Sequence, residues 1–311
     1  MRHLGLGRSP AGIVAALAML AGCGSQPPIA TPAAMPRTLS EPTQDKHSGP
    51  LLYVTNDGEA HDVTVYAANA KDPAPIRVIT DGLQFPAGVC LDGQGTLYVA
   101  DQNGFVAEYH AGKSKPFRVI TKGTDNPGFC AIDSEGNLWV ANVLGANITE
   151  YLKGTSKPHT VITNGLIYPV GIAIDQSGNI YVSNGSFGPT FNIVVYSAGS
   201  KSPSRTITDG VTAPVGITVD ANGTLYVAND GTNNVEEYRS GQSNPYQTIT
   251  AGLDHPVSVT VNESGYLYAT NFQNTGPVVE YAPGSITPLK RQISKGLYEP
   301  WGTAYSPPLL P

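Results

Sequence analysis

Short apolar runs alternate with polar turns from residue 51 to the end of the chain, and the pattern repeats about every 42 residues. The most regular run of each copy has an aromatic residue in its middle and ends in Asn or Asp. The six runs occupy residues 51–56, 96–101, 137–142, 179–184, 224–229 and 266–271. A fixed period of this length is typical of repeat proteins, so the sequence predicts one structural unit repeated six times.

Residues 169–210 show how one copy is organised. Four short runs rich in β-branched and aromatic residues are separated by clusters of Asp, Asn, Gly and Pro, which is typical of strands joined by tight turns. The first run is apolar at nearly every position, so we expect it to be buried on both faces. No window has the period of an amphipathic helix. Each copy is therefore predicted to be a sheet of four antiparallel strands.

Six four-stranded units predict an all-β fold, a six-bladed β-propeller that spans residues 51–311. The folded region begins at Leu51 with a second strand and ends with a first strand at 300–305. The C-terminal strand can therefore pair with the N-terminal strand, complete the first blade and close the ring. Closure removes the exposed sheet edges that an open array would leave.

The first 22 residues have the pattern of an export signal, with Arg2 and Arg8 before a short apolar stretch. The stretch ends in Leu-Ala-Gly-Cys, which resembles the lipobox of bacterial lipoproteins. That resemblance implies cleavage after residue 22 and a lipid on Cys23, and the alternative is an ordinary secretory signal with a chance cysteine. Residues 23–50 are rich in Pro, Ala, Ser and Thr and are expected to form a disordered tether. The expected location is the bacterial cell envelope, lipid-anchored at the outer membrane or the outer face of the plasma membrane, with the propeller outside the cytoplasm.

Charge and cysteine content narrow the picture further. The net charge is −6, and removal of residues 1–22 takes away two arginines and no acid, which leaves −8. An acidic exported chain has no electrostatic footprint for nucleic acid.

Cys90 and Cys130 lie on first strands of consecutive copies, on opposite strand faces, so they could meet at one blade interface and form a disulfide. The alternative is two small buried apolar residues, because the Cα separation decides the matter.

The motif Pro-x-Gly-Ile-Ala-x-Asp, followed by Gly-Asn-Leu-Tyr-Val-Ala-Asn, resembles the NHL repeat and recurs from about residue 51 to 306. The resemblance implies a binding module, although related propellers include gluconolactonase-like and streptogramin-lyase-like enzymes. In those enzymes the middle residue of the Pro-x-Gly motif supplies a metal ligand or a histidine. Here the corresponding residues are Ala87, Gly128, Val170, Val215, Val257 and Trp301. These departures argue against catalysis by either mechanism, and no metal or other cofactor is expected.

The candidate ligand surface is the end of the ring that carries the loops before each first strand and between the second and third strands. One Asn or Asp per blade lies there, including Asn142, Asn184 and Asn229, either to bond a ligand or to cap turns. The loop between Asn184 and Ile193 is longer than its counterparts and carries Phe187 and Phe191.

Trp301 also departs from the repeat, because the other blades have Ala, Gly or Val at its position. Exposed aromatic residues on a rigid scaffold favour binding, and the alternative is that Trp301 fills the channel while the two Phe residues pack on a neighbouring blade.

The sequence thus predicts a lipid-anchored extracytoplasmic propeller that acts as a binding or scaffold module for a protein or glycan. The alternative is a hydrolase or lyase with an atypical site in the channel. A surface-layer role without a small ligand is a third interpretation, suggested by the uniformity of the copies.

Overall fold

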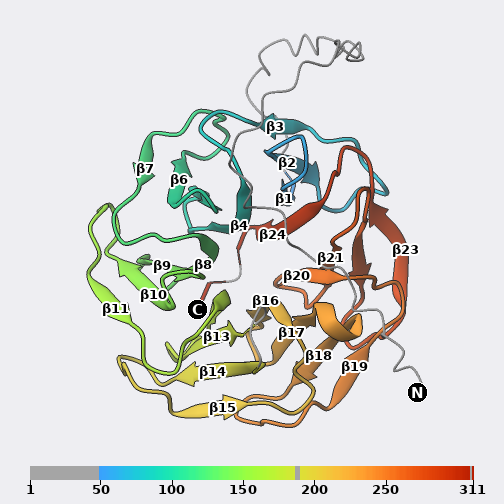
Figure 1. The fold of residues 1–311 in the computed structure, drawn as a ribbon. Helices are drawn as coiled ribbons and strands as arrows, with labels where there is room; N and C mark the ends of the chain where they lie inside the picture. The colour runs from blue at the N-terminus through green and yellow to red at the C-terminus, as the bar shows by residue number, and fades with distance from the viewer. Residues whose placement is uncertain (1–48, 186–189, 309) are drawn as a thin grey trace, which may run out of the picture. The chain divides into compact units, whose positions relative to one another are not determined.

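The six predicted units are the six blades of a closed β-propeller (Figure 1). The computed structural model describes residues 49–185, 190–308 and 310–311. Each blade is a four-stranded antiparallel sheet whose strands run in order from the ring centre to the rim. The predicted fold class is therefore confirmed.

Blade 1 combines both ends of the folded region. It consists of β24 (Pro300–Ser306), β1 (Leu51–Asn56), β2 (Asp62–Ala67) and β3 (Arg77–Ile79). The inner strand β24 pairs with β1 in antiparallel register, with Leu51 opposite Ser306 and Tyr53 opposite Ala304. The C-terminal strand closes the ring as the sequence predicted.

The other five blades follow the chain without crossovers. Blade 2 contains β4 (Pro86–Leu91), β5 (Leu97–Asp101), β6 (Phe105–Tyr109) and β7 (Arg118–Ile120). Blade 3 contains β8 (Pro127–Ile132), β9 (Leu138–Asn142), β10 (Asn147–Tyr151) and β11 (Thr160–Ile162). Blade 4 contains β12 (Pro169–Ile174), β13 (Ile180–Asn184), β14 (Asn192–Tyr196) and β15 (Arg205–Ile207). Blade 5 contains β16 (Pro214–Val219), β17 (Leu225–Asn229), the 3₁₀ turn η1 (Asp230–Thr232), β18 (Asn234–Tyr238) and β19 (Gln247–Ile249). Blade 6 contains β20 (Pro256–Val261), β21 (Leu267–Asn271), β22 (Val278–Tyr281) and β23 (Pro288–Ile293).

A buried tyrosine at or next to the end of the third strand of every blade links successive blades. Tyr109 of blade 2, for example, donates its hydroxyl proton to the carbonyl oxygen of Asp81, at 2.7 Å, in the loop that leaves blade 1. The same bond recurs around the ring, with oxygen–oxygen distances of 2.6 to 2.8 Å. The aromatic ring of each tyrosine packs between two sheets, and its hydroxyl group has a hydrogen-bond acceptor. The bond offsets the cost of burying the hydroxyl group. The six tyrosines are Tyr66, Tyr109, Tyr151, Tyr196, Tyr238 and Tyr281.

Cys90 and Cys130 are joined by a disulfide, with Cα atoms 5.8 Å apart. The bond links β4 of blade 2 to β8 of blade 3, so of the two arrangements considered from the sequence the structure shows the pair. We expect Cys90→Ala/Cys130→Ala to lower the free energy of unfolding by about 3 kcal/mol, since the bond closes a long loop in the unfolded chain. Urea unfolding of this variant and of the oxidised wild type measures the difference. Equal midpoints, or two titratable thiols in the oxidised wild type under denaturing conditions, would contradict it.

The predicted signal segment, Cys23 and the tether up to residue 48 lie outside the described residues. Within the part of the chain that the structure describes, no helix is long and apolar enough to span a bilayer.

Candidate functional site

The two ends of the ring differ in the connections that they carry. The loop end, as we name it, carries the loops before each inner strand, such as 80–85, and those between second and third strands, such as 102–104. The hairpin end carries the turns between first and second strands, such as 92–96, and those between third and fourth strands, such as 110–117. Binding residues concentrate on surface loops of rigid scaffolds, so the loop end is the candidate binding surface.

The amides predicted to face a ligand at the loop end are buried and cap the adjoining loop. Asn184 is 1% exposed, and its Oδ1 accepts bonds from the backbone N–H groups of Ile167 and Tyr168 at 2.7 and 3.2 Å. Asn142 and Asn229 are fully buried and accept the equivalent backbone bonds. The turn-capping interpretation therefore describes these three residues, and the ligand interpretation is corrected, because their oxygen atoms already serve the loop backbone.

Trp301 fills the channel instead of standing on a loop. Its side chain is 6% exposed and packs with the buried residues Ala87, Val170, Val215 and Val257. Trp301 thus plugs the loop end of the channel, and its assignment to an exposed ligand surface is corrected. Trp301 stands where the other blades have Ala, Gly or Val, and its large side chain fills part of the space near the ring axis.

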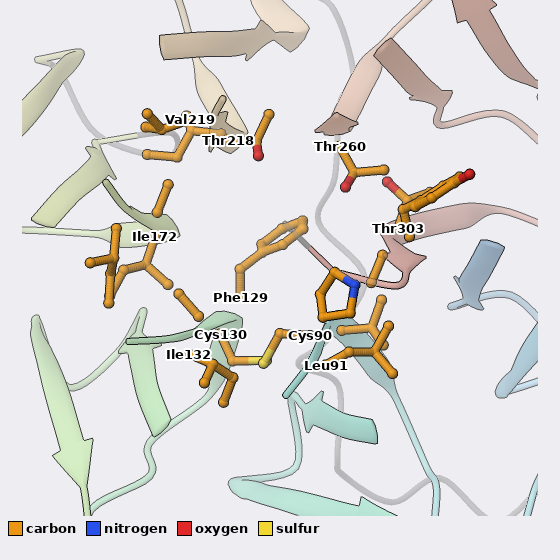
Figure 2. Close-up of a pocket in the computed structure, with 18 of the residues that line it drawn as sticks. Cys90, Leu91, Phe129, Cys130, Ile132, Ile172, Thr218, Val219, Thr260 and Thr303 are labelled. Atoms are coloured by element: carbon orange, nitrogen blue, oxygen red, sulfur yellow. A yellow bond between two sulfur atoms is a disulfide. The ribbon is translucent and has the colours of Figure 1, made fainter. Parts of the chain in front are cut away.

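Phe272 and Phe129 also belong to the plug. The Phe272 ring meets Trp301 edge to face, with centroids 4.9 Å apart. Phe129, from β8, is buried and lies near the middle of the ring in Figure 2.

The hairpin end of the channel holds a cavity of about 120 Å³ (Figure 2). Its walls carry the Cys90–Cys130 disulfide and the hydroxyl groups of Thr218, Thr260 and Thr303. The C-terminal residues Pro308, Leu310 and Pro311 line it as well, and the C-terminus lies at the ring centre in Figure 1. No feature of the sequence predicted that the C-terminal residues would line the channel.

The long loop of blade 4 is described only in part. Phe187 lies among residues 186–189, outside the described residues. Phe191 is half-buried and packs against the cluster between blades 4 and 5, which includes Tyr181 and Val211. Phe191 therefore contributes to packing, as the alternative interpretation held.

The structure adds three exposed apolar side chains at the loop end that the sequence analysis missed. Phe85, Leu144 and Ile167 are 45%, 66% and 47% exposed and come from blades 2, 3 and 4. A signal for Phe85 and Ile167 was present in the alignment of the six copies. The two residues before the inner-strand proline are Asp and Asn in blade 3 and Asp and His in blade 6, whereas Phe85 and Ile167 are apolar.

A carboxyl group with a raised pKa lies beside this surface. The pKa of Asp57 is raised to about 6, mainly by burial; His61 opposes the shift, and the negative charges of Glu299 and Asp101 add to it. The His61 ring packs edge to face on Phe85, with centroids 4.7 Å apart. The Asp57 carboxyl group therefore has a pKa in the mildly acidic range.

This shift predicts a pH dependence of stability. Because the pKa of Asp57 is higher in the folded than in the unfolded chain, its contribution is fully present below about pH 4 and is lost as the pH rises through about 6. Asp57→Asn should remove that loss, so the variant gains stability relative to wild type between pH 5 and 7. Urea unfolding at pH 4.5, 6 and 7.5 tests this, with the exposed neighbour Glu59→Gln as control. Parallel pH profiles of Asp57→Asn and wild type would contradict it.

The middle residues of the Pro-x-Gly motif in five blades, Ala87, Val170, Val215, Val257 and Trp301, are buried and apolar. In the ranges 49–185, 190–308 and 310–311, no three His, Cys, Asp or Glu side chains are grouped so that they could hold a metal ion.

Comparison with known proteins supports the architecture. No protein-family model matches the chain, and no curated protein matches it in sequence. Many solved structures share its fold. A chain from the crystal structure of a nidogen/laminin complex superposes with a TM-score of 0.72 at 17% identity, covering 83% of this chain and 98% of that one. A protein of unknown function from Bacteroides caccae gives a TM-score of 0.68 at 14% identity, covering 83% and 99%. At these identities the likeness concerns the fold alone.

Proposed function

We propose that this chain is an NHL-type propeller, anchored by a lipid on Cys23 to the outside of a bacterial membrane, that holds a partner protein or glycan on its loop end. The fold is consistent with such a binding or scaffold role. The lipobox-like sequence and the Pro-rich tether support the anchor. The tether would keep the propeller clear of the lipid surface.

The observation that carries the proposal is the set of three exposed apolar side chains on the loop end, Phe85, Leu144 and Ile167. They come from three consecutive blades, and the backbone N–H groups of Phe85 and Ile167 bond the buried side chains of Asp101 and Asn184, which hold these two loops in place. Large apolar side chains on an ordered loop lose little entropy on binding, and residues of this kind dominate interface energies. Because the plug closes the loop end of the channel, a partner on this end would bind the loop surface.

Capture from the native envelope tests the partner. Detergent-solubilised protein should retain a specific protein or polysaccharide that a Phe85→Ser/Leu144→Ser/Ile167→Ser variant loses. The matched control is Val161→Ser/Ile286→Ser, since these side chains are 46% and 53% exposed away from the loop end. Retention by the loop-end variant as strong as by the control would move the site elsewhere.

The anchor is tested separately. Cys23→Ala should release the protein from the membrane fraction into the soluble extracytoplasmic fraction, while a chain that keeps Cys23 stays with the membrane. A Cys23→Ala protein that still sediments with membranes would refute the lipid anchor and leave the loop-end proposal untouched.

A further inference from the structure

A buried carboxylate and a guanidinium link two blades near the hairpin end. Glu108 on β6 stands opposite Arg118 on β7. Arg118 donates from Nε to Glu108 Oε1 at 2.7 Å and from Nη2 to Oε2 at 2.5 Å. Its Nη1 donates to the carbonyl oxygen of Gly154, at 2.5 Å, in the hairpin turn of blade 3. The guanidinium group therefore bridges blade 2 and blade 3.

Two other blades satisfy the equivalent glutamate in related ways. In blade 6, Arg291 donates to Glu280 at 2.5 Å. In blade 5, the Glu237 carboxylate accepts bonds from Tyr246 at 2.6 Å and from Gln247 at 3.0 Å. Both glutamates are buried, and each has donors from the outermost strand or the segment that leads into it. A buried carboxylate needs such partners, because an unpaired one is costly.

Blade 3 has a glutamate at this position but no basic residue opposite it. Glu150 on β10 stands opposite Thr160 on β11, whose side chain is too short to reach across as Arg118 does. Among the described residues, the Glu150 carboxylate forms no hydrogen bond and no ion pair, and its side chain is only half-buried. The position of the missing arginine is open to solvent.

A groove of about 420 Å³ occupies this place between blades 3 and 4. Glu150 and Thr160 line one wall, and the turn glycine Gly199 of blade 4 lines the other. Gly199 and Gly154 hold the same position in the hairpin turns of their blades, and both have positive φ. The groove thus combines a carboxylate and a turn of the next blade, the two partners that Arg118 has one blade earlier.

The charges and the aromatic residue beside the groove favour a cation. Asp133, Glu135 and Glu150 line it, against the single basic side chain Lys201 among the described lining residues. Trp139 is the cross-strand neighbour of Glu150 on β9 and also lines the groove. An indole ring beside a carboxylate suits a guanidinium group, which is planar and weakly hydrated.

We propose that the groove between blades 3 and 4 binds the guanidinium group of an arginine side chain from a partner protein, paired with Glu150. A guanidinium can bond both carboxylate oxygens and the turn at once, whereas an ammonium group cannot form this fork. The site lies near the hairpin end and does not depend on the proposed loop-end partner.

Short peptides test the chemistry. Titration of the ¹⁵N-labelled propeller with acetyl-Gly-Ser-Arg-Ser-Gly-amide should shift the Glu150, Thr160 and Gly199 amide resonances in a saturable manner. The peptide with Lys in place of Arg should bind at least fivefold more weakly. Equal affinity for the two peptides, no saturation up to about 10 mM, or tighter binding of free L-arginine than of the arginine peptide would each overturn the proposal.

Two variants locate the binding. Glu150→Gln should lower the affinity for the arginine peptide at least tenfold. Thr160→Arg should do the same and also raise the thermal midpoint, because the new side chain occupies the groove from within. Ser156→Arg adds the same charge to an exposed turn residue of blade 3, and Glu263→Gln removes an exposed acid of blade 6, so neither should change binding. Unchanged peptide affinity in Glu150→Gln overturns the proposal even if Thr160→Arg fails to fold.

Discussion

Gly171→Ala should lower the free energy of unfolding by about 3 kcal/mol, although it adds a single methyl group. An added Cβ would lie 2.3 Å from the carbonyl oxygen of Val215 in the next blade and 2.8 Å from Ser183 Oγ. The inner strands meet around the channel, so neither strand can move away without opening the ring. Urea unfolding followed by Trp fluorescence measures the loss.

The same close approach recurs at the third residue of the Pro-x-Gly motif in three other blades, and at the second residue, Gly128, in blade 3. An added Cβ would lie 2.4 to 2.8 Å from backbone atoms of the next inner strand at Gly88, Gly128, Gly216 and Gly302. These distances explain why glycine recurs at these positions. The motif allows adjacent inner strands to approach closely around the channel.

Gly93→Ala is the matched control for Gly171→Ala. Gly93 lies at the hairpin end, and the one atom within 4 Å of its added Cβ is Leu310 Cδ1, at the end of a flexible side chain. We expect a change below about 1 kcal/mol there. A similar loss in both variants would show that the close approach of two blades does not set the effect, since the lower entropy of the unfolded chain would by itself stabilise both variants.

The repeat made the fold predictable, because each copy reports the same strands and turns independently. The start at Leu51 with a second strand and the end at 300–305 with a first strand predicted ring closure. The turn-capping role of Asn142, Asn184 and Asn229 was also open to prediction, since a cap that serves the fold must recur in every blade. Local, repeated interactions are therefore the part of this molecule that its sequence encodes most plainly.

The candidate sites were harder to predict because they depend on how different blades meet. The sequence shows that Trp301 stands where the other blades have a small residue. Whether its indole ring fits inside the channel depends on the channel width, which the sequence does not show. To predict that Glu150 has no basic partner, one must know the register between the third and fourth strands. In that register Thr160 of blade 3 occupies the position that Arg118 has in blade 2. That register is not evident from a strand only three residues long, such as 160–162.

A chain that ends at Glu299 should fail to fold into the native ring, because it lacks β24, the inner strand of blade 1. The loss of Trp301 alone from a core costs about 3–5 kcal/mol, and the truncation also removes Tyr305 and exposes the β1 edge, against a typical total stability of about 5–15 kcal/mol. Circular dichroism should show no cooperative unfolding transition, whereas a control chain that ends at Ser306 keeps one. A synthetic peptide of residues 300–311 should restore the transition when added to the shorter chain. If the chain ending at Glu299 unfolds cooperatively near the wild-type midpoint without the peptide, pairing of β24 with β1 is not what holds the six blades in a ring.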